Sequence, residues 1–372
     1  MSLKNVKLAI VCDWLTNTGG AEKVILALHH LFPKAPIYTS IYNPQKIKGF
    51  ENAIINTSYL QNLPFAKDKH QLYLALMPHA FERFDLSGYD IVISSSHSCA
   101  KGVITKPQTL HICYCHSPMR YAWENSHKYI QEYEVNSIVK KIAPLFMHKI
   151  RMWDRLSADR VDNFIANSKH IQNRINKYYR KPSSVIYPFV DCKNYNVNPN
   201  RQDFFLAVGR LTPYKKFDLI IETFNELNLP LKIVGTGVAY KKLKEMANDN
   251  IEFLGHVSNN KLTELYSQAK ALIFPQIEDF GITPLEAMAS GCPVIAYNKG
   301  GALETIVDKK TGIFFNEQNA VTLKAAIEKF NKMNFDPQAI REHAEKFDLK
   351  IFNEKMLEFI EKKWENWVTD MH

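Results

Sequence analysis

Residues 278–296 read EDFGITPLEAMASGCPVIA and join a tight turn to a helix and the helix to a strand. The apolar run ALIFP (271–275) leads into this stretch, and PVIAY (293–297) closes it. Thr is favoured at a helix cap and Pro at the first helical position, which predicts that the helix begins at Thr283 or Pro284. A strand–helix–strand unit of this kind is typical of a parallel α/β sheet.

The same stretch carries two carboxylates, Glu278 and Glu286, on either side of the Gly-Ile-Thr-Pro turn. Open α/β sheets bind ligands at the carboxyl ends of their strands, and a free helix start attracts phosphate. Carboxylates accept hydrogen bonds from sugar hydroxyls, so the pair indicates a ligand with both phosphates and hydroxyls. For Glu286 a structural alternative stays open, because Thr283-x-x-Glu286 is also a capping box.

Strands and helices alternate strictly through the rest of the second half. The strand-like runs are apolar throughout, which indicates a parallel sheet covered on both faces: FFLAV (204–208), LKIVG (231–235), IEFLG (251–255) and GIFF (312–315). The first half repeats the theme less regularly, with an amphipathic helix at 21–32 and strand-like runs KLAIVC, PIYTSIY, DIVISSS, HICYCH, FIANS and SVIYP.

This alternation predicts an α/β chain with two doubly wound, Rossmann-like domains. We expect the first domain at 1–187 and the second at 204–349, joined by a linker at 188–203 that is rich in Asn and Pro. A last helix is expected from about 350 to the end, within 350–372.

The composition is that of a globular protein with a basic excess. The chain has 372 residues, 47 Lys and Arg against 38 Asp and Glu, and a formal net charge of +9. That charge suits nucleotide phosphates, an anionic membrane surface or nucleic acid, and solubility alone explains it equally well. There is no apolar run long enough to span a membrane, and the six cysteines are scattered, so we expect a cytoplasmic protein with free thiols.

Two further strand ends carry residues suited to a diphosphate. In GRLTPYKKFD (209–218), Arg210 and Lys215 can grip phosphates, although an exposed basic loop is the alternative. In DWLTNTGGAEKV (13–24), Gly19 and Gly20 allow a ligand close to the start of a helix, although a simple tight turn is the alternative. Neither segment matches the phosphate loop of nucleoside triphosphatases or the dinucleotide fingerprint.

HICYCHSPMRYAWE (111–124) places His116 at the end of a strand. Arg120, Tyr121 and a tryptophan follow it and are candidate sugar contacts, as is Ser96 in the SSSHS run at 94–98. The alternatives are a structural histidine and hydroxyls that cap the next helix. The segment 139–156 mixes basic, aromatic and apolar residues, so it is either an amphipathic surface that binds an anionic membrane or an ordinary packed helix.

Five of these motifs, in this order, resemble the retaining glycosyltransferases of family 4, which have the GT-B fold of two Rossmann-like domains facing across a cleft. The motifs are GGAEK, CHSPMRYAW, ANS (166–168), GRLTPYKKFD and the E-x7-E segment EDFGITPLE, and the resemblance covers essentially the whole chain. The amino-acid sequences of these motifs are most similar to those of the WbaZ-like bacterial mannosyltransferases, which build O-antigen or related surface polysaccharides from GDP-mannose. The resemblance also implies that the C-terminal helix, 350–372, returns to the first domain.

The resemblance implies a role for each matching position. Arg210 and Lys215 would neutralise the donor diphosphate, and His116 would lie near the transferred sugar. Lys216 stands where this group often has Gly, so either Lys215 or Lys216 could contact the diphosphate. The remaining donor-binding positions are Gly19 and Gly20 near the diphosphate or acceptor, Glu278 on the donor sugar, Glu286 on the ribose, and Phe280, Gly281, Ile282 and Thr283 around the helix start.

The resemblance further implies a retaining, metal-independent transfer with no cofactor beside the nucleotide-sugar donor. Asp-x-Asp, a motif that holds a metal on a diphosphate, does not occur in the sequence, and we predict no metal site. The expected acceptor is a glycan or polyprenyl-diphosphate-linked sugar at the inner face of the plasma membrane, and no nucleic-acid motif is recognised. The alternatives are a UDP-sugar donor, a soluble acceptor, or a sugar-nucleotide-binding subunit without catalysis.

Overall fold

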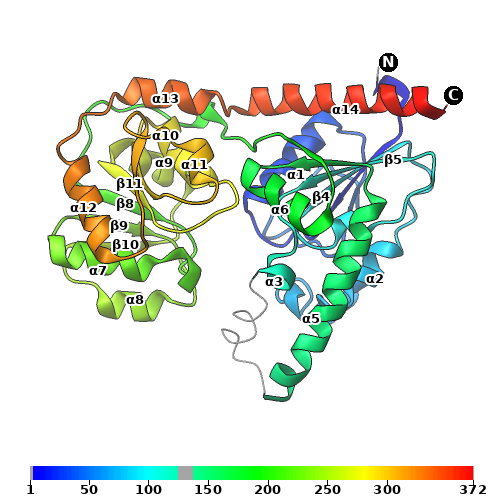
Figure 1. Cartoon of the computed structure of the whole chain (residues 1–372), viewed down its shortest axis with the longest axis horizontal. Helices are drawn as coiled ribbons and strands as arrows, with labels where there is room; N and C mark the ends of the chain where they lie inside the picture. The colour runs from blue at the N-terminus through cyan, green and yellow to red at the C-terminus, as the bar shows by residue number, and fades with distance from the viewer. Residues whose placement is uncertain (1–2, 125–136, 372) are drawn as a thin grey trace. The chain divides into compact units, whose positions relative to one another are not determined.

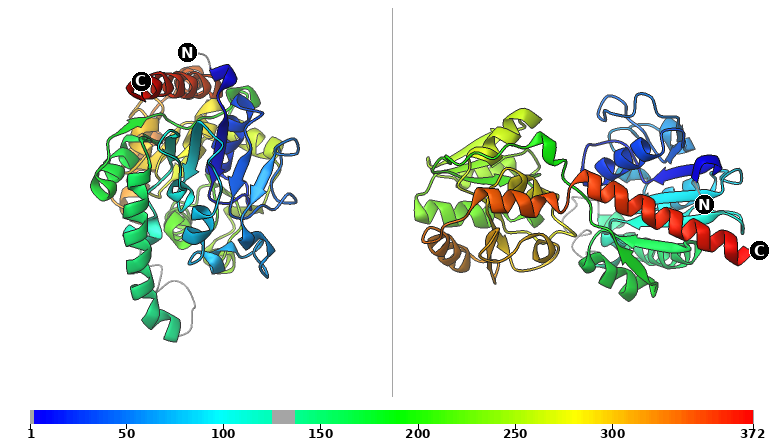
Figure 2. Two further views of the ribbon diagram at one scale, coloured as in Figure 1. Left: turned by 90° about the vertical axis from the view of Figure 1, so that its right-hand side faces the viewer. Right: turned by 90° about the horizontal axis from the view of Figure 1, so that it is seen from above.

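The computed structural model describes residues 3–124 and 137–371. The chain divides into two compact units, one made of Met1–Tyr187 with Asn353–His372 and the other of Pro188–Phe352. Each unit contains one parallel sheet flanked by helices (Figure 1 and Figure 2). The predicted α/β class with two doubly wound sheets is therefore confirmed.

The first unit holds a seven-stranded sheet with the order β3-β2-β1-β4-β5-β6-β7, and its neighbouring strands pair in parallel. The sequence order reverses between β1 and β4, which is the topological switch point where sheets of this kind bind ligands. The strands are β1 (Leu8–Cys12), β2 (Ile37–Thr39), β3 (Ile55–Thr57), β4 (Ile91–Ser96), β5 (Leu110–Cys115), β6 (Asn163–Ala166) and β7 (Ser183–Val185).

Helices of ordinary and 3-10 type connect these strands. Ser168 caps one of them, its hydroxyl accepting the N–H of Ile171. The helices are η1 (Leu3–Asn5), α1 (Gly20–Leu31), η2 (Tyr59–Asn62), η3 (His70–Tyr73), α2 (Met77–Glu82), η4 (Ala100–Gly102), α3 (Arg120–Trp123), α5 (Ser137–Ser157), η5 (Ala158–Arg160), α6 (Lys169–Tyr179) and α14 (Leu349–Met371), of which α14 belongs to this unit from Asn353 onward.

The second unit holds a six-stranded parallel sheet with the order β10-β9-β8-β11-β12-β13, which reverses between β8 and β11. Its strands are β8 (Phe205–Val208), β9 (Leu231–Val234), β10 (Ile251–Gly255), β11 (Ala271–Phe274), β12 (Val294–Tyr297) and β13 (Gly312–Phe315). Its helices are η6 (Cys192–Asn194), η7 (Pro213–Lys215), α7 (Phe217–Leu227), α8 (Tyr240–Met246), α9 (Asn259–Gln268), α10 (Ile282–Ala289), α11 (Ala302–Thr305), α12 (Ala320–Phe330) and α13 (Pro337–Glu345).

The helices of the second unit form two groups, which explains why its strands are apolar on both faces. α7 packs against α8 and α12, and α10 packs against α9, α11 and α13. In Figure 1 the two groups lie toward opposite sides of the sheet. Strand residues such as Leu206, Ile233 and Ile295 are fully buried between them.

The segment 188–203, expected as a linker, is hydrogen-bonded to the second unit. The N–H of Val190 donates to the carbonyl of Phe347 at 3.0 Å. The Arg201 guanidinium donates to carbonyls at the end of α9 and to that of Ser290 at 2.7 Å. The segment therefore has a defined conformation along the surface of that unit.

Candidate active site

A lysine and a glutamate form an ion pair in the second unit. Lys215 ends η7, which follows β8, and Glu278 lies in the loop after β11. β8 and β11 are neighbours, so their carboxyl ends meet at one edge of the sheet. The Lys215 ammonium contacts the Glu278 carboxylate, and the side chains are only 14% and 20% exposed. The structure thus joins two predicted site residues from distant segments of the chain.

Two glycines of the loop after β12 pack closely against the main chain around Glu278. The N–H of Gly301 donates to the Glu278 carbonyl at 2.8 Å. A Cβ on Gly301 would lie 2.2 Å from the Phe280 Cα, and one on Gly300, whose φ is +70°, would lie 2.6 Å from the Glu278 carbonyl oxygen. Only glycine permits this close backbone approach. These two glycines were not among the predicted site residues, although a Gly pair at a strand end was a usable signal.

Helix α10 begins at Ile282, one or two residues before the predicted start. Its N-cap is Gly281, whose φ of +94° suits glycine, and no side chain caps the helix. The N–H groups of Ile282 and Thr283 therefore lie in its first turn, where helix geometry provides no carbonyl partner for them. These donors, beside the Lys215–Glu278 pair, form an arrangement suited to an anion.

The capping-box interpretation of Glu286 is wrong, because Thr283 lies inside the helix and does not cap it. The Glu286 carboxylate instead accepts a hydrogen bond from the Tyr266 hydroxyl at 3.2 Å. Burial and the Glu286 charge raise the pKa of Tyr266 well above its ordinary value, so this tyrosine stays a donor. Tyr195 also lies near Glu286, and burial together with the Glu286 charge raises the pKa of Tyr195. Two tyrosines that the sequence analysis missed thus orient Glu286.

The remaining basic residues near β8 differ in their surroundings. Arg210 is exposed two residues after the end of β8. Lys216 has a left-handed backbone with φ +58°, a conformation in which glycine is favoured. That geometry is consistent with the glycine that the resemblance implies at this position. The structure joins Lys215, and not Lys216, to Glu278.

In the first unit, His116 follows β5 directly and is held by its neighbour strand. Its Nε2 lies 2.8 Å from the Ser95 hydroxyl oxygen. Burial, with a smaller effect of nearby His97, lowers the pKa of His116 to about 3, so the ring is neutral near pH 7. A neutral imidazole can hydrogen-bond a sugar but carries no charge to stabilise a phosphate.

The other candidates in this unit have structural contacts. Ser96 is buried at the end of β4, and Tyr121 is buried with its hydroxyl 2.8 Å from the Ser98 hydroxyl. Trp123 stacks on Tyr178 and donates to the buried Asp154. These side chains serve the interior of the unit rather than an open sugar-binding surface. Arg120 begins α3, Gly19 is the extended N-cap of α1, and Gly20 is the first residue of α1.

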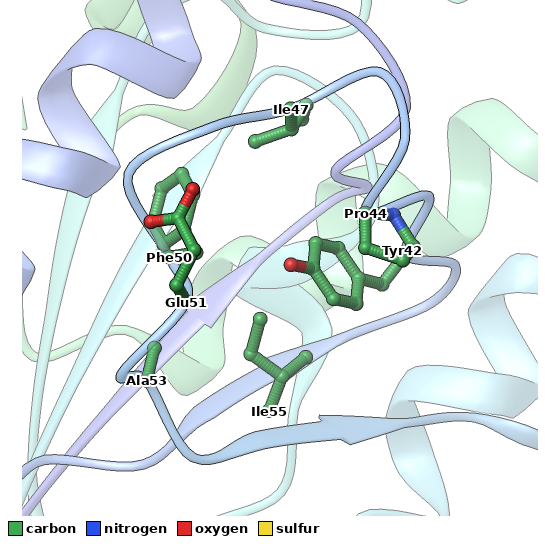
Figure 3. A pocket seen from close by; sticks show the side chains of 7 residues that line it. All are labelled: Tyr42, Pro44, Ile47, Phe50, Glu51, Ala53 and Ile55. Carbon is green, nitrogen blue, oxygen red and sulfur yellow. The ribbon is translucent and has the colours of Figure 1, made fainter.

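A cavity of about 510 Å³ lies elsewhere in the first unit, lined by the connection from β2 to β3 and by the first residue of β3. Its lining residues are Tyr42, Pro44, Ile47, Phe50, Glu51, Ala53 and Ile55. Figure 3 shows the Tyr42 hydroxyl pointing into this space. None of its lining residues was among the predicted site residues, because all of them except Ile55 lie in an irregular connection.

No three metal-binding side chains gather among residues 3–124 and 137–371. In the same residues, no helix is long and apolar enough to cross a bilayer.

Two family models match the chain, one after the other. The model described as Glycosyltransferase Family 4 matches residues 18–194, and the one described as Glycosyl transferases group 1 matches residues 193–347. In structure the chain is similar to Anabaena HepE, solved with UDP and glucose, with a TM-score of 0.70, 17% identity, and coverage of 96% of this chain and 100% of that one. That likeness concerns the fold, which is GT-B.

Curated relatives include named mannosyltransferases. The chain is 31% identical over 220 residues to the O-antigen chain mannosyltransferase RfbU of Salmonella typhimurium. That alignment covers 54% of this chain and 60% of the relative. It is 26% identical over 324 residues to the alpha-1,3/1,6-mannosyltransferase ALG2 of Mus musculus. That alignment covers 74% of this chain and 75% of the relative. The match to the Salmonella relative thus spans about three fifths of its length. Together with the two family models and the fold, these matches show that the chain belongs to glycosyltransferase family 4.

Proposed function

We propose that this chain is a retaining mannosyltransferase that moves mannose from GDP-mannose to a lipid-linked glycan acceptor in the synthesis of a surface polysaccharide. The observation that carries the proposal is the Lys215–Glu278 pair at the carboxyl ends of β8 and β11, beside the start of α10. The named mannosyltransferases among its relatives support mannose as the sugar.

The donor diphosphate is assigned to the basic edge of the second unit. As the bond between sugar and diphosphate breaks, negative charge grows on the departing oxygen. Lys215, the exposed Arg210 and the first N–H groups of α10 supply fixed positive charge and donors there. Such groups accelerate transfer because they stabilise the transition state more than the ground state.

The two glutamates are assigned to hydroxyl groups of the donor. Glu278 would accept hydrogen bonds from the mannose hydroxyls and Glu286 from the ribose. Each carboxylate already has a cation or phenol on one side, Lys215 for Glu278 and Tyr266 for Glu286, which limits its rotation. His116, as a neutral ring, is assigned to the transferred sugar.

Retention is proposed to follow front-face attack. The acceptor oxygen bonds to the anomeric carbon on the side from which the diphosphate leaves, and the departing diphosphate oxygen takes the acceptor proton. This route requires neither a metal nor an enzyme nucleophile. It matches a site built from cations, helix donors and hydroxyl-binding carboxylates.

Glu278→Gln tests the site. The amide keeps the size of the side chain but loses the charge that pairs with Lys215, so we expect transfer to fall roughly 100-fold. The matched control is Glu328→Gln, on the exposed surface of α12, which should retain activity. Circular dichroism and thermal unfolding check that both variants fold. Full activity of a folded Glu278→Gln enzyme would contradict the assignment.

A further inference from the structure

A buried carboxylate sets the conformation of the turn after β4. Asp13 directly follows β1, and its side chain is fully buried. Its Oδ2 accepts the N–H groups of His97 at 2.6 Å and Ser98 at 2.9 Å, and its Oδ1 accepts that of Ala100 at 2.7 Å. A carboxylate with three main-chain donors is compensated despite its burial. The turn at 97–100 is therefore tied to the end of the neighbouring strand.

The same carboxylate decides which nitrogen of His97 carries the proton. The Nδ1 of His97 lies 3.1 Å from the Asp13 Oδ2. A carboxylate oxygen accepts hydrogen bonds, so Nδ1 is the donor, and in this tautomer Nε2 is the acceptor nitrogen. Asp13 is fully buried, whereas the His97 side chain is 31% exposed, so part of the ring is open to a ligand.

Aromatic neighbours restrict the ring further. His97 meets Trp14 edge-on, with ring centroids 4.6 Å apart, and its centroid lies 6.3 Å from that of His116. Ser96 and Cys115 are register partners on β4 and β5, so the two histidines that follow them leave the sheet side by side. A fixed, partly exposed imidazole ring thus lies next to a residue already assigned to the sugar.

We propose that His97 binds the acceptor sugar, its Nε2 accepting a hydrogen bond from a hydroxyl group that does not itself react, and that Asp13 is its positioning residue. The inference rests on the proposed function. The attacking hydroxyl keeps its own proton for the departing diphosphate oxygen, as the proposed front-face route requires. The new carbon–oxygen bond forms as the bond to the diphosphate breaks, and the proton passes to the departing diphosphate.

Two amide variants separate binding from structure. His97→Asn retains a polar atom at the Nδ1 position, beside Asp13, but has none at Nε2. His97→Gln retains a polar atom at the Nε2 position alone. With GDP-mannose as donor and octyl α-mannoside as acceptor probe, we expect His97→Asn to lower kcat/KM for the probe roughly tenfold or more, and His97→Gln to lower it less. Hydrolysis of GDP-mannose in the absence of the probe should stay at the wild-type rate in both.

If His97 had only a structural role, His97→Gln would lower kcat/KM more than His97→Asn, because Asn preserves the hydrogen bond to Asp13. That order, or an equal loss of hydrolysis and transfer, would overturn the role of His97. A measurement on the wild-type protein needs no variant: in ¹⁵N-histidine spectra, the His97 Nε2 resonance should shift when octyl α-mannoside is added, and an unchanged resonance would also overturn it. Failure of the wild-type protein to turn over GDP-mannose would instead contradict the proposed function on which the inference rests.

Discussion

Lys215 and Lys216 are adjacent in sequence but differ in geometry, and this difference is testable. Lys215 pairs with Glu278, whereas Lys216 adopts a left-handed backbone. We expect Lys215→Ala to lower mannosyl transfer at least roughly 100-fold, because a fixed charge near the leaving group is lost. Steady-state kinetics with GDP-mannose measure the effect.

Lys216→Gly is the matched control for that variant. Glycine relieves the left-handed conformation but makes the unfolded chain more flexible, so the free energy of unfolding should change by less than about 1 kcal/mol. Transfer should stay close to the wild-type rate. A larger loss of transfer in Lys216→Gly than in Lys215→Ala would show that the diphosphate contact had been assigned to the wrong lysine.

The sequence indicated some of these residues better than others. Glu278 and Lys215 follow apolar strands, so the rule for strand ends was enough to select them. Tyr266 lies on a buried helix face and reads as core, and its contact with Glu286 depends on how α9 and α10 pack. Asp13 and His97 are 84 residues apart, and only the parallel register of β1 and β4 brings them together.

Among the secondary-structure elements, α5 shows how one helix can have two surfaces. Phe146 and Trp153 pack against the core of the first unit, and Ile150 is part of that core. Leu145, Met152 and Leu156 are exposed on another face. Figure 1 and the left view of Figure 2 show the beginning of α5 extending beyond the rest of this unit. The packed-helix alternative therefore describes one face, and the membrane proposal applies to the other.

The exposed face of α5 makes a prediction about membrane binding. Leu145, Lys149, Met152 and Leu156 recur at helical spacing, so they lie on one stripe, and Lys149 is exposed within it. Such a stripe can insert apolar groups while its cation meets anionic headgroups. In vesicle co-sedimentation, Leu145→Ser with Leu156→Ser should weaken binding to phosphatidylglycerol vesicles roughly tenfold.

The control for α5 is Val321→Ser on α12, which removes an equally exposed apolar group from the second unit. It should bind as the wild-type protein does. Added salt should weaken wild-type binding, since screening acts on exposed charges. Equal binding to neutral and anionic vesicles would argue against an electrostatic membrane surface.

One strand and the start of one helix differ from the sequence-based prediction. β3 was not predicted because it has only three residues, lies at the edge of the sheet and contains no apolar run. The predicted start of α10 was late because Gly281, in a left-handed conformation, caps the helix in place of Thr283. Turn geometry of this kind depends on the backbone that surrounds it, here the loop with Gly300 and Gly301.

For the whole molecule, buried histidines predict how stability depends on pH. Burial is the main cause that lowers the pKa of His70 and His111 to about 4 and that of His116 to about 3, against an ordinary value of 6.5. The unfolded chain therefore binds protons that the folded chain excludes, and the free energy of unfolding falls as the pH falls below 6.5. Between about pH 7 and about pH 5, each residue lowers it by about 2 kcal/mol.

Urea unfolding at the two pH values measures this effect. His111→Gln should reduce the difference between them, because the glutamine does not titrate. Its site is well defined, with the Ser94 hydroxyl 2.8 Å from Nε2 and the Arg160 carbonyl 3.1 Å from Nδ1. A stability that rises on acidification would contradict the neutral state of these histidines.

Turnover of a panel of sugar nucleotides tests the preference for GDP-mannose most directly. The wild-type protein is incubated with GDP-mannose, GDP-glucose, UDP-glucose and UDP-galactose, and nucleoside diphosphate release is followed with and without octyl α-mannoside. We predict that GDP-mannose is turned over fastest and that the probe accelerates its turnover. Preference for a UDP-sugar would contradict the donor assignment, and absence of turnover with every donor would contradict the proposed activity.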